Sequence, residues 1–379
     1  MSEKFIDQLV RPCIRDATLF TPAPSPVRGA GAAMDDALDT RLNTNENPYE
    51  AFGQLGKGLH RYPSKQPADI VAALATLYQV DAQNTLVTPG ADHGLDLLIR
   101  TFCEPGVDAV LSCPPTFSFL GHTLAINNVG HVSVPLAQDD FSLQPDAVIA
   151  AATATTTLKA VYLCNPCQPT GNALNTDDIL AIATALKGRA LVIVDEVYAE
   201  FAAAIAAITP GTLSMTQYFA THPNVVVLRS LSKAYSLAGV RCGVVLAHPG
   251  VIAYLHKAML PYTLARTGRE AIVHITSPQA QRHAQESIKR IHAERERLFT
   301  HLEQHPAVRK VWPSVTNFLY VQLYDRNTVV RACATQSVHV HLIPDDETAI
   351  RVSIGLPEAN DRFLAVLSHT THQPRKRAL

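Results

Sequence analysis

The stretch SLSKAYSLAGVRCG, residues 230–243, contains Lys233, the residue with the clearest potential for chemistry. Most lysines are solvated surface groups, but Lys233 is surrounded by serines and small apolar residues, and Arg241 follows closely. The preceding run VVVLRS is rich in β-branched residues and predicts a buried strand that ends just before the lysine. Because partial burial and a nearby cation favour the neutral form of an amine, Lys233 is a candidate nucleophile.

Other residues with chemical potential also follow predicted strands. They lie in the short segments GAD (90–92), CPPTF (113–117), NPCQPTG (165–171) and DEVY (195–198). If parallel strands bring these segments to one edge of a sheet, a carboxylate, a phenol, an aromatic ring and an anion-binding helix start join the amine and the arginine. Pyridoxal phosphate suits this set, since it has an aldehyde for a lysine, a ring nitrogen for a carboxylate, a flat ring and a phosphate.

The elements that must position these residues are short apolar runs that alternate with helical patterns. Expected strands lie near residues 85–90, 107–115, 159–166, 190–198, 225–230 and 243–247, and expected helices lie near 91–102, near 116–124 and from Thr176 onward. This alternation indicates βαβ units and a mainly parallel sheet. A long polar helix from Pro278 and the later runs NFLYVQL, VHVHLI and AIRVSIG predict a smaller α+β domain. Residues 1–40 are rich in Pro, Ala and Gly and predict an extended arm.

Composition and motifs exclude several classes of protein. The chain has 379 residues, with 32 Lys and Arg against 33 Asp and Glu, so no net field favours nucleic acid or an anionic membrane. A charged N-terminus that does not fit a signal peptide, and the lack of an apolar run of membrane length, lead us to expect a cytoplasmic protein. There is no GxGxxG after a predicted strand, no Walker motif and no GxSxG, which argues against the commonest nucleotide and hydrolase sites.

The cysteines and histidines do not point to a disulfide framework or a metal site. The chain has seven cysteines, an odd number, and most lie in apolar segments. Cys164 and Cys167 form a CxxC pair, but no second pair stands at zinc-finger spacing. His339 and His341 leave open an exposed strand face or a metal pair, without further ligands at fixed spacing. We therefore expect no bound metal.

The motifs taken together resemble the fold-type I pyridoxal-phosphate aminotransferases, and within them the histidinol-phosphate aminotransferases. The resemblance runs from LNTNENP (42–48) and RYP (61–63) to IRVSIG (350–355), and is closest in GADHGLDLLIRTFCEPG, CPPTF, the PTG turn, DEVYAEF and LSKAYSLAGVRCG. It implies an α/β fold with a large domain at residues 45–265, whose mainly parallel sheet has seven strands, and a smaller α+β domain at 266–379. Residues 1–44 are then an N-terminal arm that joins the small domain or a dimer contact.

The resemblance also implies roles for individual residues. Lys233 would form the covalent link with the cofactor aldehyde, Asp195 would pair with the ring nitrogen, and Tyr198 would donate to the phenolate oxygen. The remaining expected cofactor contacts are stacking by Phe117, an amide from Gln168, and phosphate contacts from Ala91, Asp92, Ser230, Ser232 and Arg241. Arg351 corresponds to the arginine that binds the substrate anion in the family, and Tyr62 to an aromatic residue that reaches into the site of the partner subunit.

The sequence departs from the family pattern at one of these positions and at one further position. Gln168 stands where the family has asparagine, which keeps the amide but lengthens the side chain by a methylene group. His341 aligns nearest to a family arginine that helps to hold the substrate phosphate. Histidine offers a single pH-dependent charge in place of a bidentate guanidinium, so we expect a substrate phosphate to bind less tightly than in the family.

The predicted function is transfer of an amino group between a small amino donor, histidinol phosphate or a related amino acid, and a 2-oxo acid such as 2-oxoglutarate. The resemblance places such an enzyme in amino-acid biosynthesis and implies a homodimer with shared active sites. Gln168 and His341 motivate an alternative, namely a pyridoxal-phosphate enzyme of the same fold with another substrate or with decarboxylase, oxidase or lyase chemistry. A non-catalytic regulatory homologue is a third possibility, against which the intact Lys233, Asp195, Tyr198 and Arg241 argue.

Overall fold

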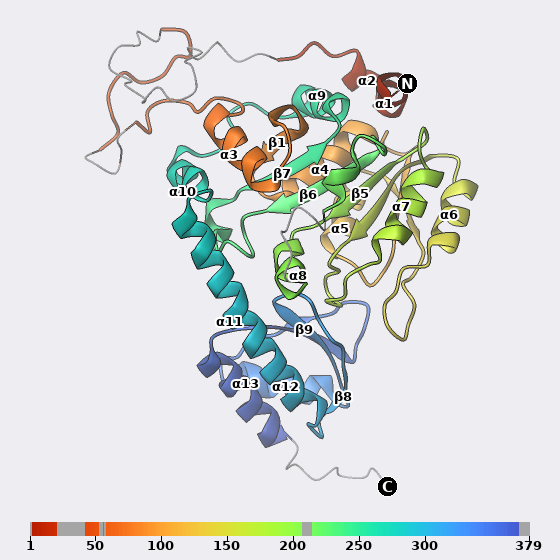
Figure 1. The fold of residues 1–379 in the computed structure, drawn as a ribbon, viewed down its shortest axis with the longest axis vertical. Coiled ribbons are helices and arrows are strands. Elements are labelled where there is room, and N and C mark those ends of the chain that lie inside the picture. The colour runs from red at the N-terminus through yellow and green to blue at the C-terminus, as the bar shows by residue number, and fades with distance from the viewer. Residues whose placement is uncertain (1, 21–41, 53–55, 57, 207–213, 371–379) are drawn as a thin grey trace.

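The computed structural model of the chain describes residues 2–20, 42–52, 56, 58–206 and 214–370 and contains two sheets (Figure 1). The larger sheet has seven strands in the order β1-β7-β6-β5-β4-β2-β3, and the smaller has four in the order β10-β11-β9-β8. In Figure 1 the larger sheet lies above the smaller one, and helix α11 runs from beside α10 down to the smaller sheet near β8. Within the described ranges, no helix has the length and apolar character needed to cross a membrane.

The strands of the larger sheet are short and, apart from β3, mostly buried. They are β1 (Thr85–Thr88), β2 (Ala109–Ser112), β3 (Gly130–Ser133), β4 (Leu158–Cys164), β5 (Leu191–Asp195), β6 (Val225–Ser230) and β7 (Gly243–Ala247). Strands β3, β2, β4, β5 and β6 pair in parallel, whereas β7 runs antiparallel to both β1 and β6. Valine-rich runs suit strands that are covered on both faces. The predicted mainly parallel sheet of seven strands is confirmed.

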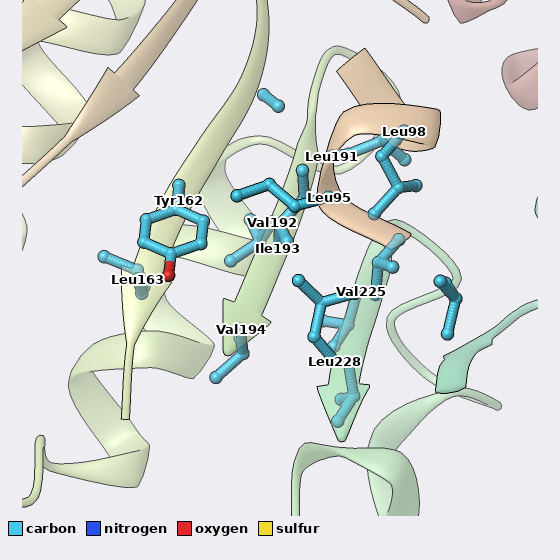
Figure 2. Close-up of a cluster of buried hydrophobic side chains, with 14 of the residues drawn as sticks. Leu95, Leu98, Tyr162, Leu163, Leu191, Val192, Ile193, Val194, Val225 and Leu228 are labelled. Carbon is cyan, nitrogen blue, oxygen red and sulfur yellow. The ribbon is translucent and has the colours of Figure 1, made fainter. Parts of the chain in front are cut away.

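Helices connect these strands and pack around the sheet. They are α3 (Ala68–Tyr78), α4 (Ala91–Phe102), α5 (Phe119–Ile126), α6 (Pro145–Ala154), α7 (Thr176–Ala185), α8 (Ala199–Ile205) and α9 (Pro249–Ala258). Local signals set several of their starts: the side chain of Asn175 accepts a hydrogen bond from the Asp177 amide at the start of α7. Leu95 and Leu98 of α4 point toward the apolar side chains of β5 and β6 in Figure 2, so burial of this helix face holds α4 against the sheet.

The second, smaller α+β region forms around the four-stranded antiparallel sheet. Its elements are α10 (Arg269–His274), α11 (Pro278–Glu303), β8 (Val308–Val311), β9 (Phe318–Leu323), α12 (Arg326–Thr335), β10 (His341–Leu342), β11 (Ala349–Ser353) and α13 (Pro357–Thr370). Helix α11 begins at Pro278 as predicted, because the Ser277 hydroxyl caps it by accepting a hydrogen bond from the Ala280 amide.

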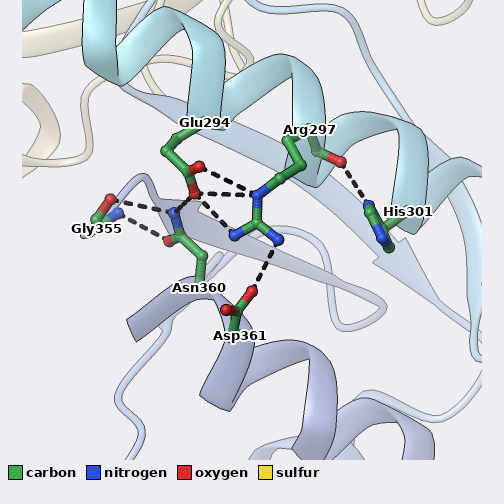
Figure 3. Close-up of polar contacts among 6 residues, drawn as sticks. All are labelled: Glu294, Arg297, His301, Gly355, Asn360 and Asp361. Atoms are coloured by element: carbon green, nitrogen blue, oxygen red, sulfur yellow. Dashed lines mark hydrogen bonds and ion pairs between the residues drawn. The ribbon is translucent and has the colours of Figure 1, made fainter. Parts of the chain in front are cut away.

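A polar cluster holds α11, α13 and the end of β11 together (Figure 3). Arg297 of α11 contacts Glu294 on the same helix at 2.8 Å and Asp361 of α13 at 2.7 Å. Asn360 donates to Glu294 at 2.9 Å and accepts from the Gly355 amide at 2.9 Å. Since Gly355 closely follows β11, these contacts help to fix the strand that carries the predicted anion-binding arginine.

The prediction of an extended N-terminal arm is wrong for residues 2–15. These residues form α1 (Ser2–Leu9) and α2 (Pro12–Arg15), and Ile6 and Val10 are buried in the core of the larger sheet. The spacing of their apolar residues stabilises short helices that pack against α9. These helices were not predicted, because residues 1–40 were considered together and the later part of that range is rich in Pro and Ala. Residues 21–41 of the predicted arm lie outside the described residues. The domain boundaries at 44/45 and 265/266 stay a prediction.

Candidate active site

One cavity beyond the carboxyl ends of the parallel strands collects the residues that the sequence singled out. Its volume is about 200 Å³. All ten residues predicted to bind the cofactor line it: Ala91, Asp92, Phe117, Gln168, Asp195, Tyr198, Ser230, Ser232, Lys233 and Arg241. They come from the start of α4 and from the ends of β2, β4, β5 and β6 or the segments that follow these strands. This placement is where parallel α/β sheets hold their ligands.

Lys233 lies shortly after β6 with its amine at the cavity. Its side chain remains reachable by solvent, but the surrounding protein still desolvates the amine, and this desolvation is the main reason that its pKa is lowered. The positive charges of Arg351 and Arg241 lower the pKa further, against the opposing effect of Asp195. The neutral amine is the nucleophilic form, so the site favours a lysine that can attack an aldehyde.

Asp195 is a buried carboxyl at the end of β5, with only 4% of its surface exposed. Its Oδ2 accepts a hydrogen bond from the Tyr162 hydroxyl at 2.7 Å, and its Oδ1 accepts from the Val197 amide at 3.2 Å. Burial raises the pKa of Asp195 to about 6, and the two hydrogen bonds limit that rise. Sequence reasoning missed Tyr162, because a tyrosine in a buried strand looks like ordinary core.

The start of α4 and Arg241 form one end of the cavity. Gly90, which precedes α4, has φ +101°, and a Cβ atom there would come within 2.5 Å of both Arg241 and Asp92. The Arg241 guanidinium and the Asp92 carboxylate form an ion pair at 3.2 Å. Ser230 Oγ accepts from the Ser232 amide at 3.1 Å beside them. A helix N-terminus, two hydroxyls and a guanidinium make this end suitable for a phosphate group.

Gln168 and Phe117 lie on the wall of the same cavity. Gln168 is 6% exposed and its backbone amide donates to the Cys164 sulfur at 3.2 Å, but its side-chain oxygen Oε1 has no hydrogen-bond partner. A buried amide that the protein leaves unsatisfied is costly unless a bound polar group completes it. Gln168 therefore brings a side-chain amide to the cavity, and the oxygen of that amide is free to accept a hydrogen bond.

Arg351, His341 and Tyr62 do not line this cavity. The Arg351 guanidinium lies 5.3 Å from the Phe318 ring centroid, and its buried Nε has no hydrogen-bond partner. His341 pairs in register with Arg351 across the β10–β11 ladder, so the two side chains share a face of the smaller sheet. Desolvation is the main reason that the pKa of His341 is lowered, and the positive charge of Arg351 lowers it further. Tyr62 is 51% exposed and stacks on Tyr262, with 4.5 Å between ring centroids.

A fully buried ion cluster lies immediately behind the site. Arg229 of β6 contacts Glu196 at 3.2 Å and Glu200 of α8 at 3.4 Å, and each of these side chains is 2–3% exposed. Glu196 also accepts from the Ser214 hydroxyl at 2.6 Å and from the Met215 amide at 2.7 Å. Because Glu196 follows Asp195 and Arg229 precedes Ser230, the cluster joins the two strand ends that deliver the carboxylate and the amine.

Comparison with known proteins shows which family the sequence of this chain matches. Residues 38–367 match the family described as aminotransferase class I and II. A histidinol-phosphate aminotransferase from Stenotrophomonas maltophilia is 37% identical over 86% of this chain and 89% of its own length. A second, from Xylella fastidiosa strain 9a5c, is 36% identical over 89% of this chain and 92% of its own.

Solved structures of low sequence identity establish the fold independently. The histidinol-phosphate aminotransferase of Sinorhizobium meliloti, determined with pyridoxal 5'-phosphate, matches with a TM-score of 0.74 at 24% identity and covers 84% of each chain. A decarboxylase from Sulfurospirillum multivorans matches with a TM-score of 0.68 at 24% identity over 79% of this chain and 85% of its own. By its family match and by relatives that align over most of its length, this chain belongs to the class I and II aminotransferases.

Proposed function

We propose that this pyridoxal-phosphate-dependent aminotransferase moves an amino group between histidinol phosphate, or a related amine or amino acid, and a 2-oxo acid such as 2-oxoglutarate. The observation that carries the proposal is the single cavity in which a lysine of lowered pKa lies with a buried carboxyl, a phenol and a phosphate-binding helix start. The names of the curated relatives supply the candidate substrate.

The residues of the cavity fit the cofactor group by group. Lys233 would hold its aldehyde carbon, Asp195 its ring nitrogen, and the start of α4 with Arg241 its phosphate. The unpartnered side-chain oxygen Oε1 of Gln168 is a buried polar atom that a bound molecule would satisfy. When bound, pyridoxal phosphate supplies an aldehyde for exchange with the amino donor and a ring that accepts the electron pair left by the departing proton.

Individual side chains of the protein are assigned to proton transfer, to contacts with the cofactor ring and to substrate binding. Lys233, in its neutral form, would take the proton from the substrate Cα, become an ammonium group, and give that proton back when the product forms. Asp195 would offer its negative charge to the ring nitrogen of the cofactor. Burial raises the pKa of Tyr198, so its hydroxyl stays protonated at neutral pH and remains a hydrogen-bond donor. Arg351, with its unpartnered Nε, would bind the anionic end of the substrate.

The direct test mixes purified protein and cofactor with a panel of amino compounds and follows the absorbance of the cofactor. We expect histidinol phosphate or a related amino compound to shift the absorbance, with 2-oxoglutarate restoring it. Identification of the product by mass spectrometry separates transamination from the alternatives. An oxo product supports the proposal, whereas a decarboxylated or eliminated product from every reactive compound would contradict it.

The substrate phosphate is expected to bind more weakly here than in a His341→Arg variant. A second guanidinium adds charge-assisted hydrogen bonds, each worth roughly 1.5–3 kcal/mol, so the variant should lower the KM for histidinol phosphate by about tenfold or more. Since the pKa of His341 lies below its ordinary value, the wild-type histidine is neutral at pH 7 and gains charge only as pH falls. The ratio of variant to wild-type affinity should therefore grow as pH rises from about 5 to 7.

Steady-state kinetics at several pH values check this, with an amino acid that lacks phosphate as a second substrate. His301→Arg on α11, an exposed histidine outside the site, is the matched control and should behave as wild type. If wild type already prefers histidinol phosphate strongly and independently of pH, and His341→Arg leaves that preference unchanged, another cation supplies the contact.

We also propose that the protein is a homodimer in which Tyr62 completes the site of the partner subunit. Tyr62 is half exposed and absent from the cavity of its own chain, and Leu42, Tyr49 and Phe52 of the same segment are exposed apolar side chains. Mixing Tyr62→Ala subunits with Lys233→Ala subunits should restore activity, because a hybrid dimer holds about one site with both residues intact. Absence of recovery after subunit exchange has been verified by mass would contradict a shared site.

A further inference from the structure

Tyr162 of β4 reaches Asp195 across two neighbouring strands. Tyr162 is opposite Ile193 in the parallel β4–β5 ladder, and Asp195 lies two residues further along β5, on the same face as Ile193. The phenol therefore extends along the sheet toward the carboxyl ends of the strands, and its hydroxyl oxygen points that way in Figure 2. The hydroxyl donates to Asp195 Oδ2 at 2.7 Å, in a region where Tyr162 itself is fully buried.

We propose that Tyr162 is a positioning residue for transamination: its hydroxyl keeps the Asp195 carboxylate ionised and holds its plane for the ring nitrogen of the cofactor. This inference rests on the proposed function. Asp195 Oδ1 accepts a hydrogen bond from the Val197 amide and Oδ2 accepts one from the Tyr162 hydroxyl, so each carboxylate oxygen has one donor from the protein. Two donors on opposite oxygens fix the carboxylate plane and leave lone pairs for a third donor, the protonated ring nitrogen.

The surroundings of Asp195 show why this donor matters. Desolvation favours the neutral carboxyl and raises its pKa to about 6, whereas the hydrogen bond from the Tyr162 hydroxyl is the strongest effect that opposes the rise. Among the other groups that face it, Asp92 of α4 raises the pKa of Asp195 and Lys233 lowers it. Further titratable groups that interact with Asp195 are Cys164, Cys167 and Tyr198.

Tyr162 is suited to act as a permanent donor. Burial, together with the charge of Asp195, raises its pKa well above the ordinary value of 10.0. The hydroxyl is therefore protonated throughout the neutral pH range, so Tyr162 stays the hydrogen-bond donor and Asp195 stays the acceptor. A carboxylate that lost this donor would be more basic, and the shared proton would shift from the ring nitrogen toward Asp195. The ring would then accept electrons less readily, while the substrate contacts would be unaffected.

The test uses Tyr162→Phe, which removes only the hydroxyl. In the enzyme freed of cofactor, the Asp195 carboxyl titration, followed by NMR with labelled aspartate, should move upward by about one pH unit, since one donor to a carboxylate is lost. In the loaded enzyme, kcat should fall about tenfold with KM changed by less than about twofold. The pH profile of the cofactor absorbance should shift in the same variant.

The matched control is Tyr320→Phe, because Tyr320 is also a buried tyrosine that donates to an aspartate, Asp346, at 2.8 Å, outside the cavity. It should leave the Asp195 titration and kcat at wild-type values. In an Asp195→Asn background, Tyr162→Phe should change cofactor affinity by less than about twofold, since the carboxylate on which it acts is gone.

Three results would overturn the inference: an unchanged Asp195 titration in Tyr162→Phe, an unchanged kcat, or an equal loss in Tyr320→Phe. Failure of the wild-type protein to bind pyridoxal phosphate would instead overturn the proposed function. The two failures are distinguishable, because the carboxyl titration is measured without cofactor.

Discussion

Lys233→Ala is expected to abolish the absorbance band of the enzyme-bound cofactor and to lower transamination at least about a thousandfold. General acid–base catalysis by a positioned side chain alone contributes roughly 10²–10⁴-fold, and the variant also loses the amine that would hold the cofactor aldehyde. No other lysine lines the cavity among the described residues. The measurement is the absorbance spectrum after incubation with pyridoxal phosphate and removal of the excess, followed by single-turnover kinetics.

Lys65→Ala is the matched control for this experiment. Lys65 is the other described lysine whose pKa burial lowers, but it donates to the His256 carbonyl at 2.6 Å and lies outside the cavity. It should retain the spectrum of the wild-type enzyme. A Lys233→Ala protein that kept the same spectrum would show that the cofactor is held elsewhere.

Arg229→Met is expected to be the most destabilising substitution near the site, at about 3–5 kcal/mol in the free energy of unfolding. Removal of the guanidinium leaves Glu196 and Glu200 fully buried without their cation, and also removes a contact 4.9 Å from the Tyr78 ring. Denaturant unfolding at pH 7, followed by circular dichroism, measures the loss. Arg100→Met, which breaks a more exposed pair with Asp96 at 2.8 Å, should cost no more than about 1 kcal/mol.

The destabilisation by Arg229→Met should also depend on pH. Desolvation raises the pKa of Glu196 and of Glu200 in the folded protein, and Arg229 opposes that rise. Without Arg229 their folded-state pKa values rise further above the unfolded values. A carboxyl with a raised folded-state pKa stabilises the fold at acid pH and loses that contribution as pH rises through this pKa. The variant should therefore lose more stability at pH 8 than at pH 5, and a loss that is constant over this range would contradict a role for buried charge.

Where the fold depends on local signals, the sequence predicted it closely. Strand β7 was expected at residues 243–247 and occupies Gly243–Ala247, because a run of β-branched and apolar residues after a glycine admits few alternatives. The predicted strand VHVHLI shrinks to β10 at His341–Leu342, since it is an edge strand with a single partner. Strand β3, GHVS, was not predicted, because its exposed side chains leave no hydrophobic pattern to detect.

For the site, motifs located the residues that line the cavity but not the residues that stand behind them. Tyr162 and Arg229 lie inside apolar strands, where a single sequence gives no sign that a side chain meets a carboxylate on a neighbouring strand. Those contacts depend on the register between β4, β5 and β6, which only the folded sheet defines. Tyr62 and Arg351 were predicted from family resemblance, and their place outside the cavity of their own chain could not be read from spacing.

The antiparallel pairing of β7 with β6 has a consequence for enzyme engineering. Ser230 and Gly243 are ladder partners, and the Leu231 amide donates to the Cys242 carbonyl at 3.1 Å, so residues 231–242 form a loop closed at its base. The amine of Lys233 and the guanidinium of Arg241 both belong to this loop, whereas Asp195 belongs to a separate strand. A graft or insertion between β6 and β7 would therefore transfer or displace the Lys233 amine and the Arg241 guanidinium together, leaving the Asp195 carboxylate in place.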